Sequence, residues 1–107
     1  MKVLLDQSIK DYQGNDIEIE GVKQTYQMII GFAVTGVVRD EILTAEKKMK
    51  AHQLANKIYG NKEVDLTADD IVFIKERVDK VWQSPLYYGR ILELLEEKVE
   101  EIKENIS

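Results

Sequence analysis

A chain of 107 residues, 44% of them hydrophobic, is long enough for one small domain with its own core. The absence of cysteine excludes disulfide bonds, thiolate metal sites and cysteine nucleophiles, and a net charge of −5 disfavours a general affinity for nucleic acid. The longest apolar run, residues 28–38, is about half of the ~20 residues that span a bilayer, and the first residues become acidic too early for a secretory signal. We therefore expect no membrane partner and no export.

The first twenty residues alternate polar and apolar side chains in two runs, residues 8–12 and 16–20, with a central glycine between them. This pattern predicts a β-hairpin. Ile9, Ile17 and Ile19 would form its apolar face. Because a two-stranded hairpin is marginal alone, we expect this face to pack on helices or to pair with a strand of a partner.

The next segment, residues 26–35, is predicted to be a helix that is apolar nearly all round. Thr25 precedes it as an N-cap, and Gly36 is placed to end it in a left-handed conformation. A helix without a polar face belongs at the centre of a domain or in an oligomer interface.

A lysine-bearing helix is predicted within residues 41–59, before a Gly-Asn stop. Its apolar positions recur at Ile42, Ala45, Met49, Leu54, Ala55 and Ile58. Because Thr44 could cap a helix that begins one residue later, residues 38–43 could form a separate turn of helix, and both readings stay open.

The stretch "DLTADD", residues 65–70, has the composition of a metal site. A helix-loop-helix calcium loop would need a glycine and a glutamate at the positions that Leu66 and Val72 occupy. Thr67, followed three residues later by Asp70, instead matches a capping box. We therefore expect a helix start here and no metal.

The Ser84-Pro85 pair predicts the start of the last helix, because serine caps and proline tolerates the first helical position. Apolar residues recur at three- and four-residue spacing to the end of the chain, although residues 97–107 are strongly charged. The stripe continues there as Val99, Ile102 and Ile106. It predicts either a coiled-coil-like contact with another chain or a frayed, solvated tail.

No catalytic or nucleotide-binding motif accompanies these elements. His52 is the only histidine, and no serine stands in a nucleophile context such as G-x-S-x-G. Gly31 and Gly36 have the spacing of a phosphate-binding loop, but Val37 and Val38 follow where a lysine and a serine or threonine are required. We expect neither an enzyme nor a bound cofactor.

An aromatic cluster surrounds the turn before the last helix: Trp82, Tyr87 and Tyr88. Arg90 follows one turn into that helix. Such side chains can fill a partner's pocket, since each aromatic ring offers a large rigid surface with a polar edge, or they can seal the junction between two helices. We take these four residues, with the apolar stripe of the tail, as the candidate interaction surface.

A longer pattern covers residues 46–96, "EKKMKAHQLANKIYGNKEVDLTADDIVFIKERVDKVWQSPLYYGRILELLE". It joins a lysine-bearing helix, an "LTA" helix start, a serine-proline turn and a glycine ahead of "LLE", and a hairpin precedes Thr25. In this order of pieces the chain resembles small proteins carried by tailed phages and prophages. The resemblance implies a phage origin and a family without an assigned activity, so no site residue is carried over.

Together the elements predict an α+β fold that is mainly α, with an N-terminal β-hairpin packed on about four helices, the last one long. We expect a single domain over residues 1–107. Its parts would be the hairpin (1–20), a helical core (25–96) and a charged helical extension (97–107).

The expected function is that of a noncatalytic phage or prophage protein that acts through protein–protein interaction and self-associates as a homo-oligomer, in the host cytoplasm or on the virion. Two alternatives stay open. The glutamates could imitate phosphate charge and inhibit a host defence or nucleic-acid enzyme. The lysine-bearing helix could instead bind DNA together with Tyr87, Tyr88 and Arg90, against which the acidic balance weighs.

Overall fold

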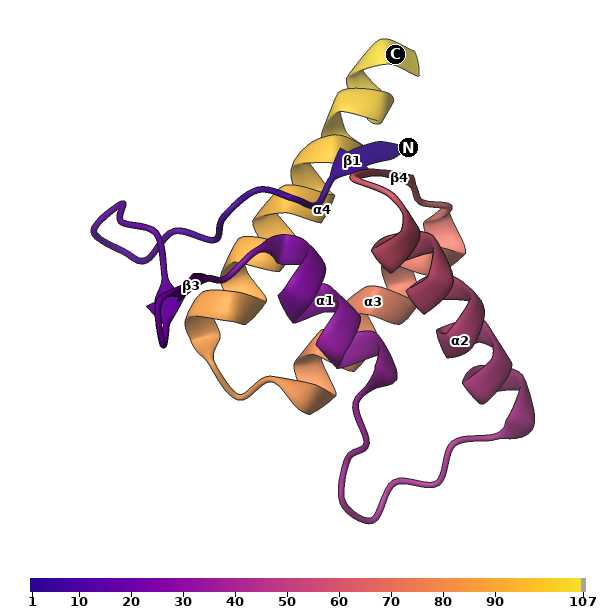
Figure 1. Ribbon diagram of the computed structural model, residues 1–107. Helices are drawn as coiled ribbons and strands as arrows, with labels where there is room; N and C mark the ends of the chain where they lie inside the picture. Colours follow the sequence, from indigo (N-terminus) through magenta and orange to yellow (C-terminus); the bar gives the residue numbers. More distant parts are fainter. Residues whose placement is uncertain (107) are drawn as a thin grey trace.

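Four helices and two small antiparallel sheets make up residues 1–106, the part of the chain that the computed structural model describes (Figure 1). Side chains are described for residues 1–96. The helices are α1 (Tyr26–Thr35), α2 (Ala45–Gly60), α3 (Ala68–Val81) and α4 (Pro85–Ile106). The strands are β1 (Lys2–Leu4), β2 (Glu18–Ile19), β3 (Val22–Lys23) and β4 (Glu63–Asp65), with β1 paired to β4 and β2 to β3. The predicted α+β, mainly α fold with an N-terminal hairpin and four helices is therefore confirmed.

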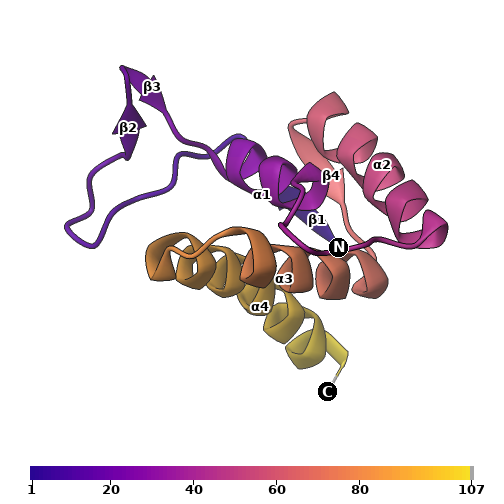
Figure 2. The same cartoon turned by 90° about the horizontal axis from the view of Figure 1, so that it is seen from below.

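Helix α1 lies at the centre of the packing, where it contacts α2, α3 and α4. Figure 2 shows α1 and α2 in one layer, with α3 and α4 in the other. The side chains that α1 adds to the single hydrophobic core are Ile29, Ile30, Ala33 and Val34. The central position predicted for this helix is confirmed. Met28 and Phe32, one turn apart, stay exposed, so α1 is not covered on every side.

Threonine side chains start the first three helices, as the sequence predicts. The hydroxyls of Thr25, Thr44 and Thr67 accept the backbone N–H three residues on, at 3.2, 3.2 and 3.1 Å. At Thr67 the box is complete, because the Asp70 carboxylate accepts the Thr67 N–H at 3.0 Å. Burial raises the pKa of Asp70, but hydrogen bonds from Thr67 and Lys57 outweigh it, so the pKa lies below its usual value. The aspartate-rich stretch is a helix start.

Helix α4 also begins where expected, at Pro85 after Ser84. The Ser84 hydroxyl accepts the Tyr87 N–H at 3.4 Å. The helix continues to Ile106, within the predicted extension 97–107. The side chains of Val99, Ile102 and Ile106, predicted as an interaction stripe, lie outside the described residues. No helix in the described part is both long and apolar enough to cross a membrane.

The N-terminal hairpin lies later in the chain than predicted. Its paired strands are β2 and β3, joined by a turn at Glu20 and Gly21 in which both residues have positive φ. The predicted pairing of residues 8–12 with 16–20 is reduced to one bridge between Lys10 and Asp16. The reason is local: the Asp11 carboxylate accepts two backbone N–H groups of the following turn and so curls the segment into a loop.

The predicted apolar face of the hairpin is divided. Ile9 is completely buried in the core and Ile17 is half-buried, whereas Ile19 is 52% exposed. Strand β1 is an element that the sequence did not predict. It pairs with β4, and the Met1 ammonium binds the Asp65 carboxylate at 2.6 Å, which holds the start of the chain against the α2–α3 connection.

Residues 38–43 form no helix, which settles the boundary that the sequence left open. Helix α2 starts at Ala45 behind its Thr44 cap, and the connection from α1 to α2 is a loop that carries Ile42 at 93% exposure. Gly36 is not left-handed, contrary to the prediction, since its φ is −65° and its ψ 148°. A side chain there would lie 2.8 Å from the Phe32 carbonyl and 3.2 Å from Val81, so close packing requires the glycine.

The buried guanidinium of Arg77 in α3 holds the end of α1 and this loop together. Arg77 is 2% exposed, and it donates to the carbonyl of Ala33 at 3.4 Å, to the carbonyl of Gly36 at 2.9 Å and to the Glu41 carboxylate. The Lys80 ammonium lies 3.0 Å from the other Glu41 oxygen. Hydrogen bonds from Arg77 and Lys80 hold the pKa of Glu41 below its ordinary value. The arginine thus satisfies helix-end carbonyls that α1 leaves open.

Replacing Arg77 with Met is expected to lower the free energy of unfolding by about 3 kcal/mol, because two carbonyls lose their donor and the half-buried Glu41 carboxylate keeps only Lys80. Urea unfolding followed by circular dichroism measures this. Arg39→Met is the matched control, since the Arg39 side chain is 96% exposed and its removal should change stability by no more than about 0.5 kcal/mol. Equal, small losses in both variants would contradict the role of Arg77.

Candidate functional site

An aromatic junction of Phe32, Trp82 and Tyr87 connects α1 to the turn between α3 and α4. The ring centroids of Phe32 and Trp82 lie 5.1 Å apart, and those of Trp82 and Tyr87 also 5.1 Å, the second pair edge to face. The Trp82 indole N–H donates to the Ile29 carbonyl at 2.9 Å. Trp82 and Tyr87 are half-buried while Phe32 is exposed. The junction therefore seals the helices and still presents ring surface to solvent.

Tyr88 and Arg90, the other predicted site residues on α4, have different surroundings. Tyr88 is half-buried and packs against the hydrophobic core. The Arg90 guanidinium donates to the carbonyls of Lys10 and Asp11, each at 3.0 Å, and to the Glu93 carboxylate at 3.3 Å. It also lies 5.6 Å from the centre of the Tyr12 ring. Arg90 thus ties the loop before β2 to α4.

A hollow of about 610 Å³ lies between that loop, the start of β2 and the start of α4, and we name it the acidic hollow. Its lining residues are Asp11, Asp16, Ile17, Glu18, Ser84, Leu86 and Tyr87. They combine three carboxylates with apolar side chains, and Tyr87 joins the hollow to the aromatic junction. Tyr87 was predicted from the sequence as an interaction residue, whereas the three acidic residues were not.

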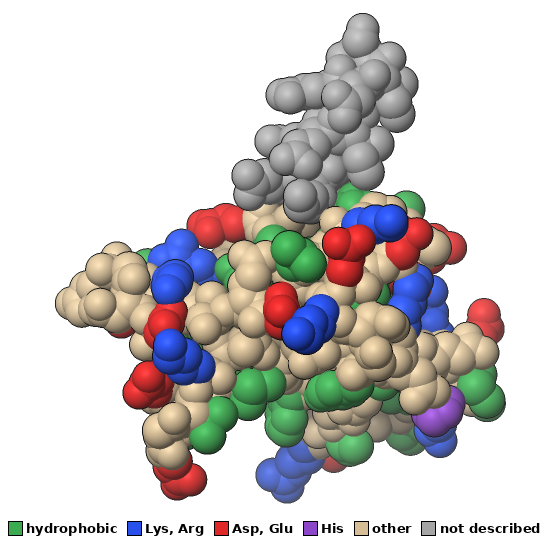
Figure 3. Space-filling model, turned by 45° about the horizontal axis from the view of Figure 1, so that its top comes forward, with side chains coloured by type: hydrophobic (Ala, Val, Ile, Leu, Met, Phe, Trp, Pro, Cys, Tyr) green, Lys and Arg blue, Asp and Glu red, His purple; other side chains and the backbone are tan. Residues whose placement is uncertain are grey.

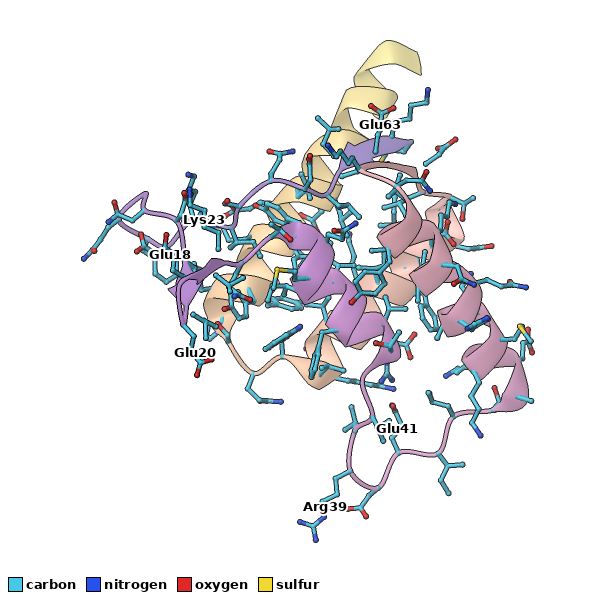
Figure 4. The ribbon with its side chains drawn as sticks, viewed as in Figure 1. Glu18, Glu20, Lys23, Arg39, Glu41 and Glu63 are labelled. Atoms are coloured by element: carbon cyan, nitrogen blue, oxygen red, sulfur yellow. The ribbon has the colours of Figure 1, made fainter. Side chains whose placement is uncertain are left out.

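The three carboxylates of the acidic hollow differ in how they are bound. Asp16 binds Lys10 and Lys23, which together hold its pKa below the usual value. Asp11 accepts the backbone N–H groups of its own turn. Glu18 forms no ion pair with any residue between 1 and 96. Figure 4 shows Glu18 and Lys23 on the hairpin, with Glu20 at its tip.

The connection between α1 and α2 presents a second unusual surface, which we name the 37–42 loop. A turn in which the Glu41 N–H donates to the Val38 carbonyl at 3.1 Å closes it, with Asp40 at a φ of 65°. Arg39 points away from the molecule in Figure 4. Val37 and Ile42 are 92% and 93% exposed. This surface was not predicted from the sequence, where Ile42 has the spacing of an apolar position in the helix of residues 41–59.

A smaller hollow of about 360 Å³ lies between this loop and α2. Its floor is apolar, and Lys48 and His52 stand at its edge. The His52 ring lies 3.4 Å from the Asn56 amide and is exposed. Among the residues with described side chains, no group of three or more histidine, aspartate or glutamate residues could hold a metal ion.

Hydrophobic surface is gathered unevenly on the molecule. Figure 3 shows it most clearly along the lower edge of that face, while charged side chains are spread over other parts. Six large hydrophobic side chains on the hairpin, α1 and the 37–42 loop have more than a third of their area exposed: Ile19, Val22, Met28, Phe32, Val37 and Ile42.

Comparison of the chain with protein-family models, with curated proteins and with solved structures finds no match.

Replacing Arg90 with Met is expected to release the loop of residues 10–16 from α4. The change removes two hydrogen bonds to carbonyls of this loop and one to the Glu93 carboxylate. Amide hydrogen exchange in this loop should rise by on the order of tenfold, with a loss of roughly 1–2 kcal/mol in global stability for two hydrogen bonds. Lys62→Met serves as the control: Lys62 is exposed and belongs neither to this loop nor to the acidic hollow, so exchange in the loop should be unchanged. Unaltered exchange in the Arg90 variant would show that the tether does not matter.

Proposed function

We propose that the protein is a noncatalytic binding protein of phage or prophage origin, active in the host cytoplasm or on the virion, whose partner is protein and in the first place another copy of itself. The observation that carries the proposal is the 37–42 loop, which exposes two large aliphatic side chains from a backbone held by a buried arginine. The phage origin rests on the resemblance of the sequence pattern alone.

The loop differs from an ordinary connection in both composition and support. Connections at the surface are usually polar and mobile. Here Val37 and Ile42 flank a charged tip, and Glu41, next to Ile42, fixes the end of the loop through its bonds to Arg77 and Lys80. A surface that is ordered before binding loses little conformational entropy on binding. The two large aliphatic side chains that this support holds in solvent are the observation that favours a docking role for the loop.

The rival functions find less support in the arrangement of charges. The lysines of α2 largely serve the fold, since Lys50 and Lys57 lie beside Asp70 and Lys47 beside Glu76. The Arg90 guanidinium is engaged by backbone carbonyls. A DNA-binding surface would need these cations free. Four glutamates that a phosphate-like acidic face could use, Glu41, Glu63, Glu76 and Glu96, lie in ion pairs. The side chains of the glutamates beyond residue 96 lie outside the described residues.

The double change Val37→Ser and Ile42→Ser is expected to weaken self-association on the order of 100-fold, because burial of each aliphatic side chain is worth at least about 1.5 kcal/mol. Light scattering over a concentration series measures it against the 12.4 kDa mass of one chain. Val72→Ser is the matched control: Val72 is 64% exposed on α3 and belongs to neither the loop nor the acidic hollow, so its change should leave association intact.

The intact chain should exceed the mass of one copy as its concentration rises. A constant mass of one copy up to millimolar concentration would overturn the proposed self-association. Equal effects of the loop variant and of Val72→Ser would instead show that the loop is not the contact.

A further inference from the structure

We propose that the 37–42 loop of one copy docks into the acidic hollow of a second copy, with Arg39 facing Asp11 and Glu18. This inference rests on the proposed self-association and deepens it by naming both surfaces of the contact. Val37 and Ile42 would cover the apolar wall of the hollow, while the guanidinium would meet its carboxylates.

The chemistry of the loop fits one side of this contact. Its outward side chains are two aliphatic groups, one cation and one carboxylate: the Arg39 side chain is 96% exposed, and the Asp40 carboxylate, 93% exposed, lies 4.0 Å away. A pair as exposed as this one is worth little, so Arg39 gives up little when it turns to another partner. The loop is thus an apolar projection whose tip carries the Arg39 cation beside the Asp40 carboxylate.

The acidic hollow offers the opposite combination. Ile17, Leu86 and Tyr87 provide apolar surface, and Asp11 and Glu18 provide negative charge. The cations nearby are already engaged, because Lys10 and Lys23 bind Asp16 and Arg90 binds two carbonyls and Glu93. The volume of about 610 Å³ lies within the range of roughly 300–1,000 Å³ that protein pockets devote to small ligands, so it can take several side chains.

The 37–42 loop does not dock into the acidic hollow of its own chain. The hairpin precedes the start of α1 and the 37–42 loop follows its end, and Figures 1 and 2 show the two at opposite ends of this helix. Ten helical residues separate them by roughly 15 Å. Two copies that dock through a single such contact keep one free loop and one free hollow, and association of this head-to-tail kind continues into rings or open chains.

Charge reversal tests the pairing directly. Arg39→Glu and Glu18→Lys should each weaken association on the order of tenfold or more, since each places like charges in the contact. A chain that carries both changes should recover most of the loss, because the negative charge now on its loop meets the positive charge now in the hollow of the next copy. Glu20→Lys is the matched control: Glu20 is on the same hairpin, is exposed and does not line the hollow, so association should be unchanged.

A mixing experiment tests the head-to-tail geometry. A copy with the Val37→Ser and Ile42→Ser loop keeps its hollow, and a copy with Glu18→Lys keeps its loop, so an equimolar mixture should form a complex of two copies and no larger one. If Glu18→Lys behaves as Glu20→Lys does, or the double charge reversal recovers nothing, the inference is overturned. The proposed self-association would still stand in that case if the intact chain associates and the loop variant does not.

Discussion

A buried positive charge needs partners, and in this chain the guanidinium of Arg77 has three. Its desolvation is costly, so the structure forms around the groups that compensate for it: two carbonyls at the end of α1 and the Glu41 carboxylate of the following loop. Through these bonds α3 fixes where α1 ends and how the chain leaves it. The position of Val37, Arg39 and Ile42 on the surface follows from this one buried side chain.

Central packing and surface function are connected at α1. One side of this helix supplies core residues, and another leaves Met28 and Phe32 exposed. Phe32 lies in the aromatic junction, whose Tyr87 lines the acidic hollow. The hairpin, whose Glu18 lines the hollow, leads directly into the start of α1, and the 37–42 loop follows the end of this helix. Helix α1 thus connects the two surfaces on which the proposed self-association rests.

Local signals made the helix starts predictable, because a threonine or serine cap bonds to residues three positions away. The partners of Arg77 lie 36 to 44 positions earlier in the chain, and an arginine between Ile74 and Val78 carries no signal that it is buried. Likewise β1 pairs with β4 about sixty residues later in the chain, and a pairing over this separation has no local sequence signal. The predicted left-handed conformation of Gly36 was wrong. A glycine is needed at this position because the backbone lies close to Val81, a contact that only the tertiary structure shows.

The candidate site was predictable to a similar degree. Clustering of aromatics identified Trp82 and Tyr87, but Phe32 joins them from a distant helix. Arg90 binds backbone carbonyls some eighty positions away, and a carbonyl has no sequence signature. The 37–42 loop was not predicted as a surface because apolar residues usually indicate burial. Ile42 was therefore predicted to lie on the apolar side of a helix, whereas in the structure it is exposed.

If the buried Arg77 holds the 37–42 loop, the loop has one conformation before any partner binds. Nuclear spin relaxation of backbone amides in the dilute, monomeric protein measures this. We expect order parameters for residues 37–42 close to about 0.85, the value of rigid backbone and comparable with α1 and α3. Values below about 0.6 in this loop, beside rigid helices, would contradict this role of Arg77.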